Sequence, residues 1–476
     1  MVKKYLQQGE KMCKNAIKRA EIGDFIDFKD EKKPRVLFVN PPVYDFSVYD
    51  FWLKPYGLLR IAGYMRDKVE ITYFDFMDRH SAYLKEEEKI PDRDAFGRGS
   101  YFAQPAKKPP EYEFIKDKHY RRFGVPQERF IDLLQTKQFD FVLITSAMTY
   151  WYLGIREVVE NVRKIQPQAK IILGGIYATL CYEHAKSLGV DFVIKGNLQS
   201  GDSQSVQNLQ MFEELFQVKL DFSEPPYWEG YTELPYGILK LNDGCPLNCS
   251  YCSVKKFYPN FSHRFSVNIQ REYEFLLKKN IRNIAFYDDA LLVDGEKILF
   301  PFLQMARELK PDILFHAPNA MHIKLINDEV AKKLKSFGFK KIFLGFESSS
   351  FRWQKETGGI SGDKTNTEQF KNAIATLKNA GFQGSDLTAY VMLGHPKQDV
   401  QEVIDSVNFV ASCGACSMLA EYSPIPSTPD GELCSKYVDL SEPLFHNSSV
   451  FPLFSFGKEK VQKVKDLVRE LNKKLR

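Results

Sequence analysis

Short apolar segments alternate with helical patterns along most of this 476-residue chain, and this alternation constrains the fold more than any other feature. The segments are rich in Val, Ile, Leu and Phe, as in residues 35–42, which end in a Pro-Pro turn. Strands that are apolar on both faces belong to parallel sheets covered by helices on each side. The sequence therefore predicts an α/β fold.

The first series of strands predicts an N-terminal doubly wound, Rossmann-like parallel sheet within residues 34–197. Its predicted strands are residues 35–42, 69–76, 139–145, 170–173 and 191–195. A long connection, residues 79–125, follows the second strand and contains Gly and Pro pairs. Connections of that length are usually functional or disordered, so a loop that covers a ligand is one of two interpretations.

Residues 198–235 are rich in Gln, Ser, Pro and Tyr and are predicted to form a linker. The alternation then resumes over residues 236–430 and predicts a partial (β/α)6 barrel of the TIM type, with the site at the carboxyl ends of its strands. The predicted barrel strands are residues 238–242, 283–287, 313–316, 341–346, 387–393 and 417–422. Residues 1–33 and 431–476 are predicted to be helical extensions.

Composition and charge exclude several classes of protein. Lys plus Arg (66) nearly balances Asp plus Glu (61), and no basic cluster stands out, so no nucleic-acid partner is expected. No run of about 18 apolar residues suggests a membrane span, and the N-terminus lacks the apolar core of a signal peptide. We therefore expect a cytoplasmic chain, in which clustered cysteines indicate a metal site or chemistry before disulfides.

Three of the eight cysteines stand directly after the first predicted barrel strand, in the segment Cys245-Pro-Leu-Asn-Cys249-Ser-Tyr-Cys252. Three thiolates on one short loop can hold an iron–sulfur cluster, and a [4Fe-4S] cluster held by three leaves one iron open. A structural zinc site is the alternative, but it needs four ligands, and His263 is the nearest candidate beyond Cys252. The spacing therefore favours the cluster.

A second cysteine pair, Cys413 and Cys416, forms a CxxC with only Cys434 nearby. An auxiliary cluster would need more thiolates, so these residues are interpreted as ordinary buried or surface thiols.

The CxxxCxxC spacing, with an aromatic residue before the third cysteine, resembles the motif of the radical S-adenosylmethionine (SAM) family over residues 235–430. In that family the open iron binds the amino and carboxylate groups of SAM. One electron then cleaves SAM to methionine and a 5′-deoxyadenosyl radical, which usually abstracts a substrate hydrogen. The resemblance implies the cluster and SAM as cofactors, a flavodoxin or ferredoxin as electron donor, and the three cysteines as catalytic metal ligands.

Other strand ends also match the family, residue by residue. Asp288 and Asp289 end the second barrel strand, where an acidic or Gly-rich motif approaches the amino group of SAM, and which of the two acts stays open. Glu347 stands in a Gly-x-Glu-Ser segment that often reaches the ribose or the methionine part. The resulting SAM-binding candidates are Tyr251, Asp288, Asp289, Glu347, Ser348 and Gly394.

Substrate-side candidates follow from position alone. Glu421 and Tyr422 end the sixth predicted barrel strand, and Asn319 and His322 follow the third. Residues at the carboxyl ends of barrel strands are the usual active-site residues. The substrate is expected to be a small molecule or natural product whose identity the sequence does not give.

A sheet domain that precedes a radical SAM core resembles the cobalamin (B12)-binding subfamily. Ser146, Gly174 and Gly175 match the small residues that flank the cobalamin tail, where backbone must approach a bulky ligand. The Asp-x-His-x-x-Gly that supplies a histidine to cobalt is replaced by Asn-Pro-Pro-Val-Tyr at residues 40–44, and the similar segment at His80 follows the wrong strand. We expect cobalamin without a protein histidine below cobalt; the alternative is a sheet that binds none.

The resemblance implies a cobalamin-dependent radical SAM methyltransferase that acts on an unactivated carbon. One alternative is a radical SAM oxidative cyclisation or rearrangement without methyl transfer. Another is a tRNA methylthiotransferase, but its first domain supplies three further cluster cysteines, and only Cys13 and Cys181 precede Cys245 here. A non-enzymatic iron–sulfur module would not need the matching strand ends.

Overall fold

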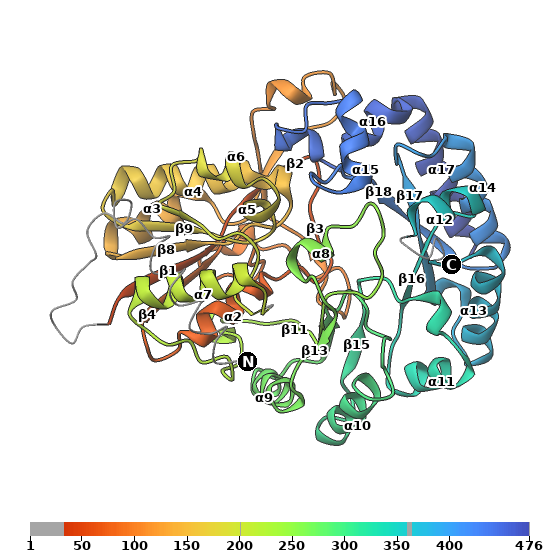
Figure 1. The fold of residues 1–476 in the computed structure, drawn as a ribbon, viewed down its shortest axis with the longest axis horizontal. Coiled ribbons are helices and arrows are strands. Elements are labelled where there is room, and N and C mark those ends of the chain that lie inside the picture. The colour runs from red at the N-terminus through yellow and green to blue at the C-terminus, as the bar shows by residue number, and fades with distance from the viewer. Residues whose placement is uncertain (1–32, 200, 359–363, 476) are drawn as a thin grey trace, which may run out of the picture.

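The computed structural model describes residues 33–199, 201–358 and 364–475, and it has the predicted α/β fold. Two α/β units lie side by side, a flat sheet covered by helices and a partial barrel (Figure 1). The helical extension expected over residues 1–33 falls almost entirely outside the described residues. No helix in the described parts of the chain is both long and apolar enough to cross a membrane.

The first unit is a five-stranded parallel sheet with the strand order β10-β9-β8-β1-β4. Its strands are β1 (Arg35–Asn40), β4 (Glu70–Asp75), β8 (Phe141–Ile144), β9 (Lys170–Leu173) and β10 (Phe192–Val193). The order of strands along the chain reverses between β1 and β8. In open α/β sheets this switch point is where ligands bind, beyond the carboxyl ends of the strands.

Helices cover both faces of this sheet because alternate residues of each strand point to opposite sides. In β1, Leu37 and Val39 pack toward α3 and α4, whereas Val36 and Phe38 pack toward α2 and α7. Figure 1 shows these two layers on either side of the strands. The helices are α2 (Tyr56–Tyr64), α3 (Gln127–Thr136), α4 (Tyr152–Ile165), α5 (Ile176–Leu180), α6 (Tyr182–Lys186) and α7 (Ser203–Phe216).

Helix α7 corrects one expectation, because residues 203–216 were predicted to lie in a linker. Phe212 and Phe216 of this helix are buried against Phe141 of β8. The polar composition concealed the helix, since Ser203, Gln204, Gln207 and Gln210 are exposed on its outer face and only a narrow stripe of it is apolar. The first unit therefore extends beyond residue 197.

The long connection between β4 and α3 is folded. It contributes to two small antiparallel sheets together with the segment that follows β1. Their strands are β2 (Val43–Asp45), β6 (Ala103–Pro105) and β7 (Arg121–Phe123) in one sheet, and β3 (Tyr49–Asp50) and β5 (Gly99–Ser100) in the other. The interpretation of this connection as a ligand cover stays a prediction.

The second unit contains six parallel strands in two three-stranded sheets, β11-β14-β15 and β16-β17-β18. Its strands are β11 (Gly237–Leu239), β14 (Asn283–Phe286), β15 (Leu314–His316), β16 (Ile342–Glu347), β17 (Leu387–Leu393) and β18 (Cys416–Glu421). Two isolated parallel bridges, Phe315 to Phe339 and Met321 to Leu344, join the sheets. These contacts make one curved sheet, the predicted partial barrel.

The first predicted barrel strand, residues 238–242, is divided in the structure. Its last residue belongs instead to β12 (Asn242–Asp243), which pairs antiparallel with β13 (Ser262–His263). The chain turns out of the barrel here, and the cysteine segment lies between β12 and β13.

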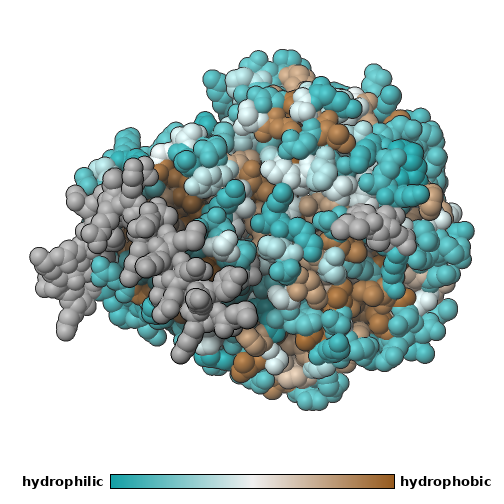
Figure 2. All heavy atoms as spheres, viewed as in Figure 1, coloured by the Kyte–Doolittle hydropathy of each residue, from teal (hydrophilic) through white to brown (hydrophobic). Residues whose placement is uncertain are grey.

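The helices of the second unit cover the outside of the barrel, except α8, which follows the cysteine segment, and they continue into a C-terminal segment. They are α8 (Val254–Phe257), α9 (Ser266–Lys278), α10 (Leu299–Leu309), α11 (Asp328–Ser336), α12 (Phe351–Thr357), α13 (Thr367–Asn379), α14 (Val400–Ser412), α15 (Pro429–Glu432), α16 (Phe451–Phe456) and α17 (Lys458–Lys474). The predicted C-terminal amphipathic helix is α17, whose Val461, Val464 and Val468 are buried in the barrel core. On the face in Figure 2 most exposed residues are hydrophilic, with separate hydrophobic areas over both units.

Aromatic side chains from the first unit pack into the second. The Trp52 ring stacks on His316 of β15 with their centroids 4.5 Å apart, and Phe51 meets Phe343 of β16 edge-on at 5.3 Å. The backbone of Lys54 donates to the Tyr287 hydroxyl over 2.9 Å. These contacts fix the sheet of the first unit relative to the strand ends of the barrel.

Two helical glycines provide a matched test of how closely α4 approaches the end of β1. A Cβ at Gly154 in α4 would overlap the carbonyl of Pro42, whereas a Cβ at Gly57 in α2 would meet nothing within 4 Å. We expect Gly57→Ala to raise the free energy of unfolding by up to about 1 kcal/mol, since Ala favours helix. Gly154→Ala should lower it, because backbone must shift. Chemical denaturation of the two variants measures both signs, and equal effects would contradict the close approach.

Candidate active site

All three cysteines of the CxxxCxxC segment line one cavity of about 300 Å³ at the carboxyl ends of the barrel strands. Asp289 follows β14, Asn319 and His322 follow β15, and Tyr390 lies in β17, and each of these also lines the cavity. The cysteine segment lies between β12 and α8, and it carries the thiols over the strand ends.

The arrangement of the thiols fits a cluster better than a single ion. Among the described residues, no three His, Cys, Asp or Glu side chains are grouped so that they could hold one metal ion. Cys245, Cys249 and Cys252 instead surround a shared space, and a [4Fe-4S] cluster is held by thiolates at separate corners. Partial burial raises the pKa of the Cys245 thiol. Such a thiol carries a proton until a metal displaces it.

A buried ion pair stands beside the cysteine loop. Lys364 contacts the Glu347 carboxylate over 2.6 Å and donates to the Tyr251 hydroxyl over 3.1 Å. Burial alone would lower the pKa of Lys364, but Glu347 and Tyr251 outweigh it and hold the pKa well above its usual value. Lys364 and Tyr251 both line the cavity, which therefore contains a fixed positive charge.

The backbone of β16 is shaped around this ion pair. Glu347 has a φ of +66°, which is unusual for a residue with a Cβ, and the pairing with β17 shifts between Gly345 and Glu347. A Cβ at Gly345 would lie 3.3 Å from Lys364 Nζ. The Gly-x-Glu segment thus combines a glycine that admits the lysine with a carboxylate that binds it. Backbone strain of this kind is typical of functional sites.

The two aspartates after β14 have different roles. The carboxylate of Asp288 accepts hydrogen bonds from the backbone N–H groups of Leu241, at 3.0 Å, and Asn242, at 2.7 Å, and it does not line the cavity. Asp289 lines the cavity and pairs with the buried Lys240 at 3.7 Å. Asp288 therefore holds the chain where it enters the cysteine segment, and Asp289 is the carboxylate that faces the cavity.

The pKa of Asp288 gives a pH-dependent prediction. Burial raises this pKa to about 7, whereas the pKa of an aspartate in an unfolded chain is about 3.9. The folded chain holds the proton more tightly, so the stability that protonated Asp288 contributes is lost as pH rises from about 4 to about 7. We expect the unfolding free energy of the wild type, relative to Asp288→Asn, to fall over this interval. Urea denaturation of both chains across this interval measures the difference, and a pH-independent difference would refute the assignment.

The candidates after β15 lie together in the cavity. His322 Nε2 is 3.9 Å from Cys245 Sγ, and burial together with the nearby charge of Lys364 lowers the pKa of His322 to about 4. Asn319 donates to the backbone carbonyls of Tyr287 and Asp288 at 3.3 and 3.2 Å. Both side chains therefore present polar atoms near the thiols, and their substrate role stays a prediction.

Two SAM-binding candidates point elsewhere. The Ser348 hydroxyl is fully buried and lies 3.4 Å from the Ser406 hydroxyl of α14, on the outer side of the strand. Gly394 has a φ of +92°, and a Cβ there would lie 2.6 Å from Pro452 of the C-terminal segment. Neither residue lines the cavity, because the strand end turns each toward the helical layer.

The substrate candidates after β18 also lie apart from the cavity. Glu421 forms an ion pair with Lys465 of α17. Tyr422 is buried in a small cluster with Trp353 and Phe451. Strand β18 ends at Glu421, within one residue of the predicted end. The C-terminal segment packs over this end and binds both side chains.

The carboxyl edge of the first sheet brings the cobalamin candidates together. The Ser146 hydroxyl donates to the Gly174 carbonyl over 2.7 Å, and a Cβ at Gly175 would overlap the Ser146 backbone. Two apolar side chains beside them are exposed, Met148 at 45% and Ile176 at 41%. Small residues and exposed apolar surface at a switch point fit a bulky ligand.

His80 is placed away from this surface. It follows β4, and its ring nitrogens lie 3.3 Å from Asp92 and 3.6 Å from Glu233. Because β4 is the sheet edge opposite β9 and β10, the histidine is not next to Ser146 and Gly174. His80 is therefore not placed to reach a ligand at this edge, and the expectation of a corrinoid without a histidine ligand stays a prediction.

Lys364 is a charged residue of the cavity that the sequence did not reveal. It precedes the Asn366 cap of α13 by two residues, and no motif around it indicates a functional lysine. Its partner Glu347 is 17 positions earlier. The one signal in the sequence was Glu347 itself, because a carboxylate at the end of a buried strand needs a cation nearby.

Family profiles match both units. A profile described as the Radical SAM superfamily matches residues 239–410, and a profile described as a B12 binding domain matches residues 116–200. The first contains the cysteine segment and the carboxyl ends of the barrel strands from β11 to β17. The second contains Ser146, Gly174 and Gly175.

Two relatives match part of the chain. The ribosomal protein uS12 methylthiotransferase RimO of Fervidobacterium nodosum is 26% identical over 188 residues, 38% of this chain and 42% of the relative. The anaerobic magnesium-protoporphyrin IX monomethyl ester cyclase of Rubrivivax gelatinosus is 24% identical over 260 residues, 46% of this chain and 45% of the relative. The chain thus spans less than half the length of either relative.

Two solved structures match both units. The radical SAM methyltransferase TsrM of Kitasatospora setae has a TM-score of 0.59 at 14% identity and covers 85% of this chain and 76% of its own. The cobalamin-dependent SAM radical enzyme OxsB has a TM-score of 0.53 at 11% identity and covers 91% of this chain and 56% of its own. At these identities the likeness shows the shared fold.

Proposed function

We propose that this chain, which belongs to the radical SAM superfamily and has an N-terminal cobalamin-binding-like domain, is a methyltransferase that acts on an unactivated carbon. The observation that carries the proposal is the cavity at the barrel strand ends, where three thiols and Lys364 meet. The switch point of the first sheet, with its exposed apolar edge, is the second site that such an enzyme needs.

The cysteines of the cavity and its charged side chains are proposed to have different roles. Cys245, Cys249 and Cys252 would hold the [4Fe-4S] cluster, and Lys364 would bind a carboxylate through its fixed charge. Asp289 offers a carboxylate to an ammonium group. When they are bound, SAM would supply a carbon-centred radical and the corrinoid would supply a transferable methyl group.

The proposal is tested without knowledge of the substrate. The chain is reconstituted anaerobically with iron, sulfide and cob(II)alamin, then reduced in the presence of SAM that carries a deuterated methyl group. We expect S-adenosylhomocysteine, deuterated methylcobalamin bound to the protein, and 5′-deoxyadenosine. A chain that retains no corrinoid and transfers no label would contradict the methyltransferase.

A radical oxidative cyclisation or rearrangement without methyl transfer is the second candidate. It is favoured by the cyclase of Rubrivivax gelatinosus, which matches nearly half of this chain. The same reaction mixture separates the two, since cyclisation predicts 5′-deoxyadenosine without S-adenosylhomocysteine. A methylthiotransferase has less support despite the match to RimO, because Cys13 and Cys181 are too few for a second three-cysteine cluster.

A further inference from the structure

Ser250, which lies between the second and third cysteines of the loop, is anchored by two other parts of the chain. Its backbone N–H donates to the Thr357 carbonyl at the end of α12 over 3.1 Å. Its hydroxyl donates to the Asp430 carboxylate of α15, and its own carbonyl accepts from the Asp430 N–H over 3.2 Å. The loop is therefore held at the residue next to Cys249.

The ionised carboxylate of Asp430 is stabilised by the groups around it. Its side chain is 0% exposed, and its carboxylate contacts His395 Nε2 at 3.1 Å and Lys397 Nζ at 2.7 Å. Burial alone would raise the pKa of Asp430, but the hydrogen bonds from His395, Lys397 and Ser250 bring it to about 2. The contact with Ser250 is thus made by a carboxylate with fixed partners.

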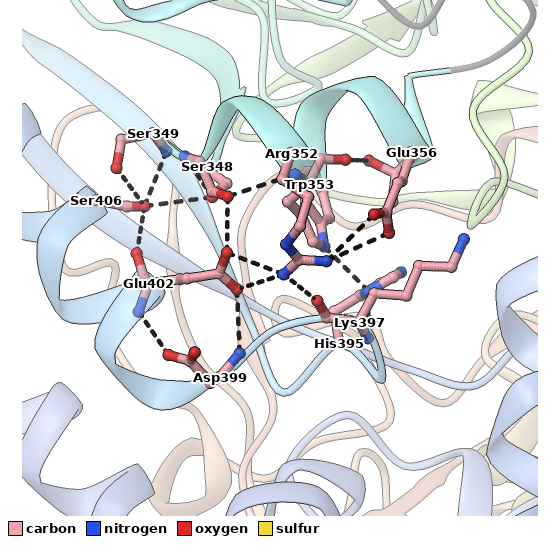
Figure 3. A network of polar contacts seen from close by, with 12 residues as sticks. Ser348, Ser349, Arg352, Trp353, Glu356, His395, Lys397, Asp399, Glu402 and Ser406 are labelled. Atoms are coloured by element: carbon pink, nitrogen blue, oxygen red, sulfur yellow. Dashed lines mark hydrogen bonds and ion pairs between the residues drawn. The ribbon is translucent and has the colours of Figure 1, made fainter.

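The same partners support the neighbouring Tyr251. The Trp353 indole N–H donates to His395 Nδ1 over 3.1 Å, and the Trp353 ring stacks on Tyr251 with centroids 5.9 Å apart. Figure 3 shows Trp353 beside His395, and Arg352 of the same helix joined to Glu402 of α14 at 2.9 Å. Helix α12 is therefore joined to the barrel wall, and it contacts the cysteine loop through Trp353 and Thr357.

The segment that carries Asp430 is anchored again at its far end. Asn447 donates to the buried Asp45 carboxylate over 3.0 Å, and His446 Nδ1 lies 3.1 Å from the Thr149 hydroxyl. Asp45 ends β2, the short strand that follows β1, and Thr149 begins the 3-10 turn that follows β8, so both lie at the carboxyl edge of the first sheet. Residues 429–450 thus extend from the cysteine loop to the first unit.

We infer that Ser250 and Asp430 are positioning residues, which hold the cysteine loop so that the iron-bearing thiols face the cavity. This inference rests on the cluster at Cys245, Cys249 and Cys252, and not on methyl transfer. The sequence did not reveal it, because Asp430 lies 180 residues after Ser250 and beyond the last barrel strand.

The test removes only the loop side of the contact. Ser250→Ala leaves Asp430 paired with His395 and Lys397, and Ser435→Ala, whose hydroxyl bonds Glu432 on the same C-terminal segment, is the matched control. The full chain is reconstituted with cluster and reduced, and its electron paramagnetic resonance spectrum is recorded with SAM. We expect Ser250→Ala to broaden the spectrum and to slow formation of 5′-deoxyadenosine about tenfold, the value of one lost charge-assisted hydrogen bond.

A conservative variant separates positioning from folding. Ser250→Thr retains the hydroxyl and should restore the spectrum and the rate, and circular dichroism should show that Ser250→Ala is folded, as Ser435→Ala is. A Ser250→Ala chain with the wild-type spectrum and rate would overturn the inference. So would a folded Ser250→Thr chain that is as impaired as Ser250→Ala. A wild-type chain that forms no cluster at all would instead contradict the function proposed for this cavity.

Discussion

Cys249→Ser is expected to abolish both iron–sulfur absorbance and SAM cleavage, because two thiolates and a hydroxyl do not hold the cluster that three thiolates hold. Cys249 lies in the middle of the loop and lines the cavity with Cys245 and Cys252. The measurement is iron and sulfide content per chain after anaerobic reconstitution, together with 5′-deoxyadenosine released after reduction with SAM. We expect both to fall to the level of the unreconstituted chain.

Cys413→Ser is the matched control, since this thiol is partly buried near α14 and does not line the cavity. It should bind iron and cleave SAM as the wild type does. If Cys249→Ser retained wild-type cleavage, or if Cys413→Ser lost its iron, the three-cysteine site would be wrong. The control also tests the interpretation of Cys413 and Cys416 as ordinary thiols.

Lys364→Met is expected to destabilise the chain by about 3–5 kcal/mol, because it leaves Glu347 buried without its partner. The side chains of Lys364 and Glu347 are only 14% and 8% exposed. The double variant Lys364→Met with Glu347→Gln should recover much of this loss, since no uncompensated charge remains. Urea denaturation of the single and double variants measures the coupling. Additive effects would contradict a buried ion pair.

An exposed ion pair calibrates this experiment. Lys333 pairs with Glu296 at 2.6 Å, but Glu296 is 58% exposed. Lys333→Met should therefore change the unfolding free energy by less than about 1 kcal/mol.

The double variant at Lys364 and Glu347 should recover stability, but it should not recover SAM cleavage, because the cavity has lost the positive charge of Lys364. Restored cleavage would mean that the lysine acts only on stability.

The strands and their carboxyl ends could be predicted because burial on both faces leaves a continuous apolar run in the sequence. Strand β9 lies at the predicted residues, and β17 lies at its predicted range 387–393. The cysteine segment could be placed for the same reason, since it follows directly after such a run. Position at a strand end, however, does not determine which way a side chain turns.

Ser348, Gly394 and Tyr422 illustrate that limit. Each stands at a predicted strand end, but α14 and the C-terminal segment pack there and bury them outside the cavity. Conversely, Lys364 contacts Tyr251, and Asp430 contacts Ser250, across more than a hundred residues of chain. Such contacts depend on tertiary packing, which local periodicity does not encode.

We expect SAM to bind at the iron left free by Cys245, Cys249 and Cys252, and magnetic resonance can detect this bond. Electron–nuclear double resonance is recorded on the reduced, reconstituted chain with SAM labelled with nitrogen-15 at the methionine amino group. We predict a resolved nitrogen-15 coupling, because that amino group would be bonded to iron. A reduced cluster that binds SAM without any such coupling would contradict this expectation.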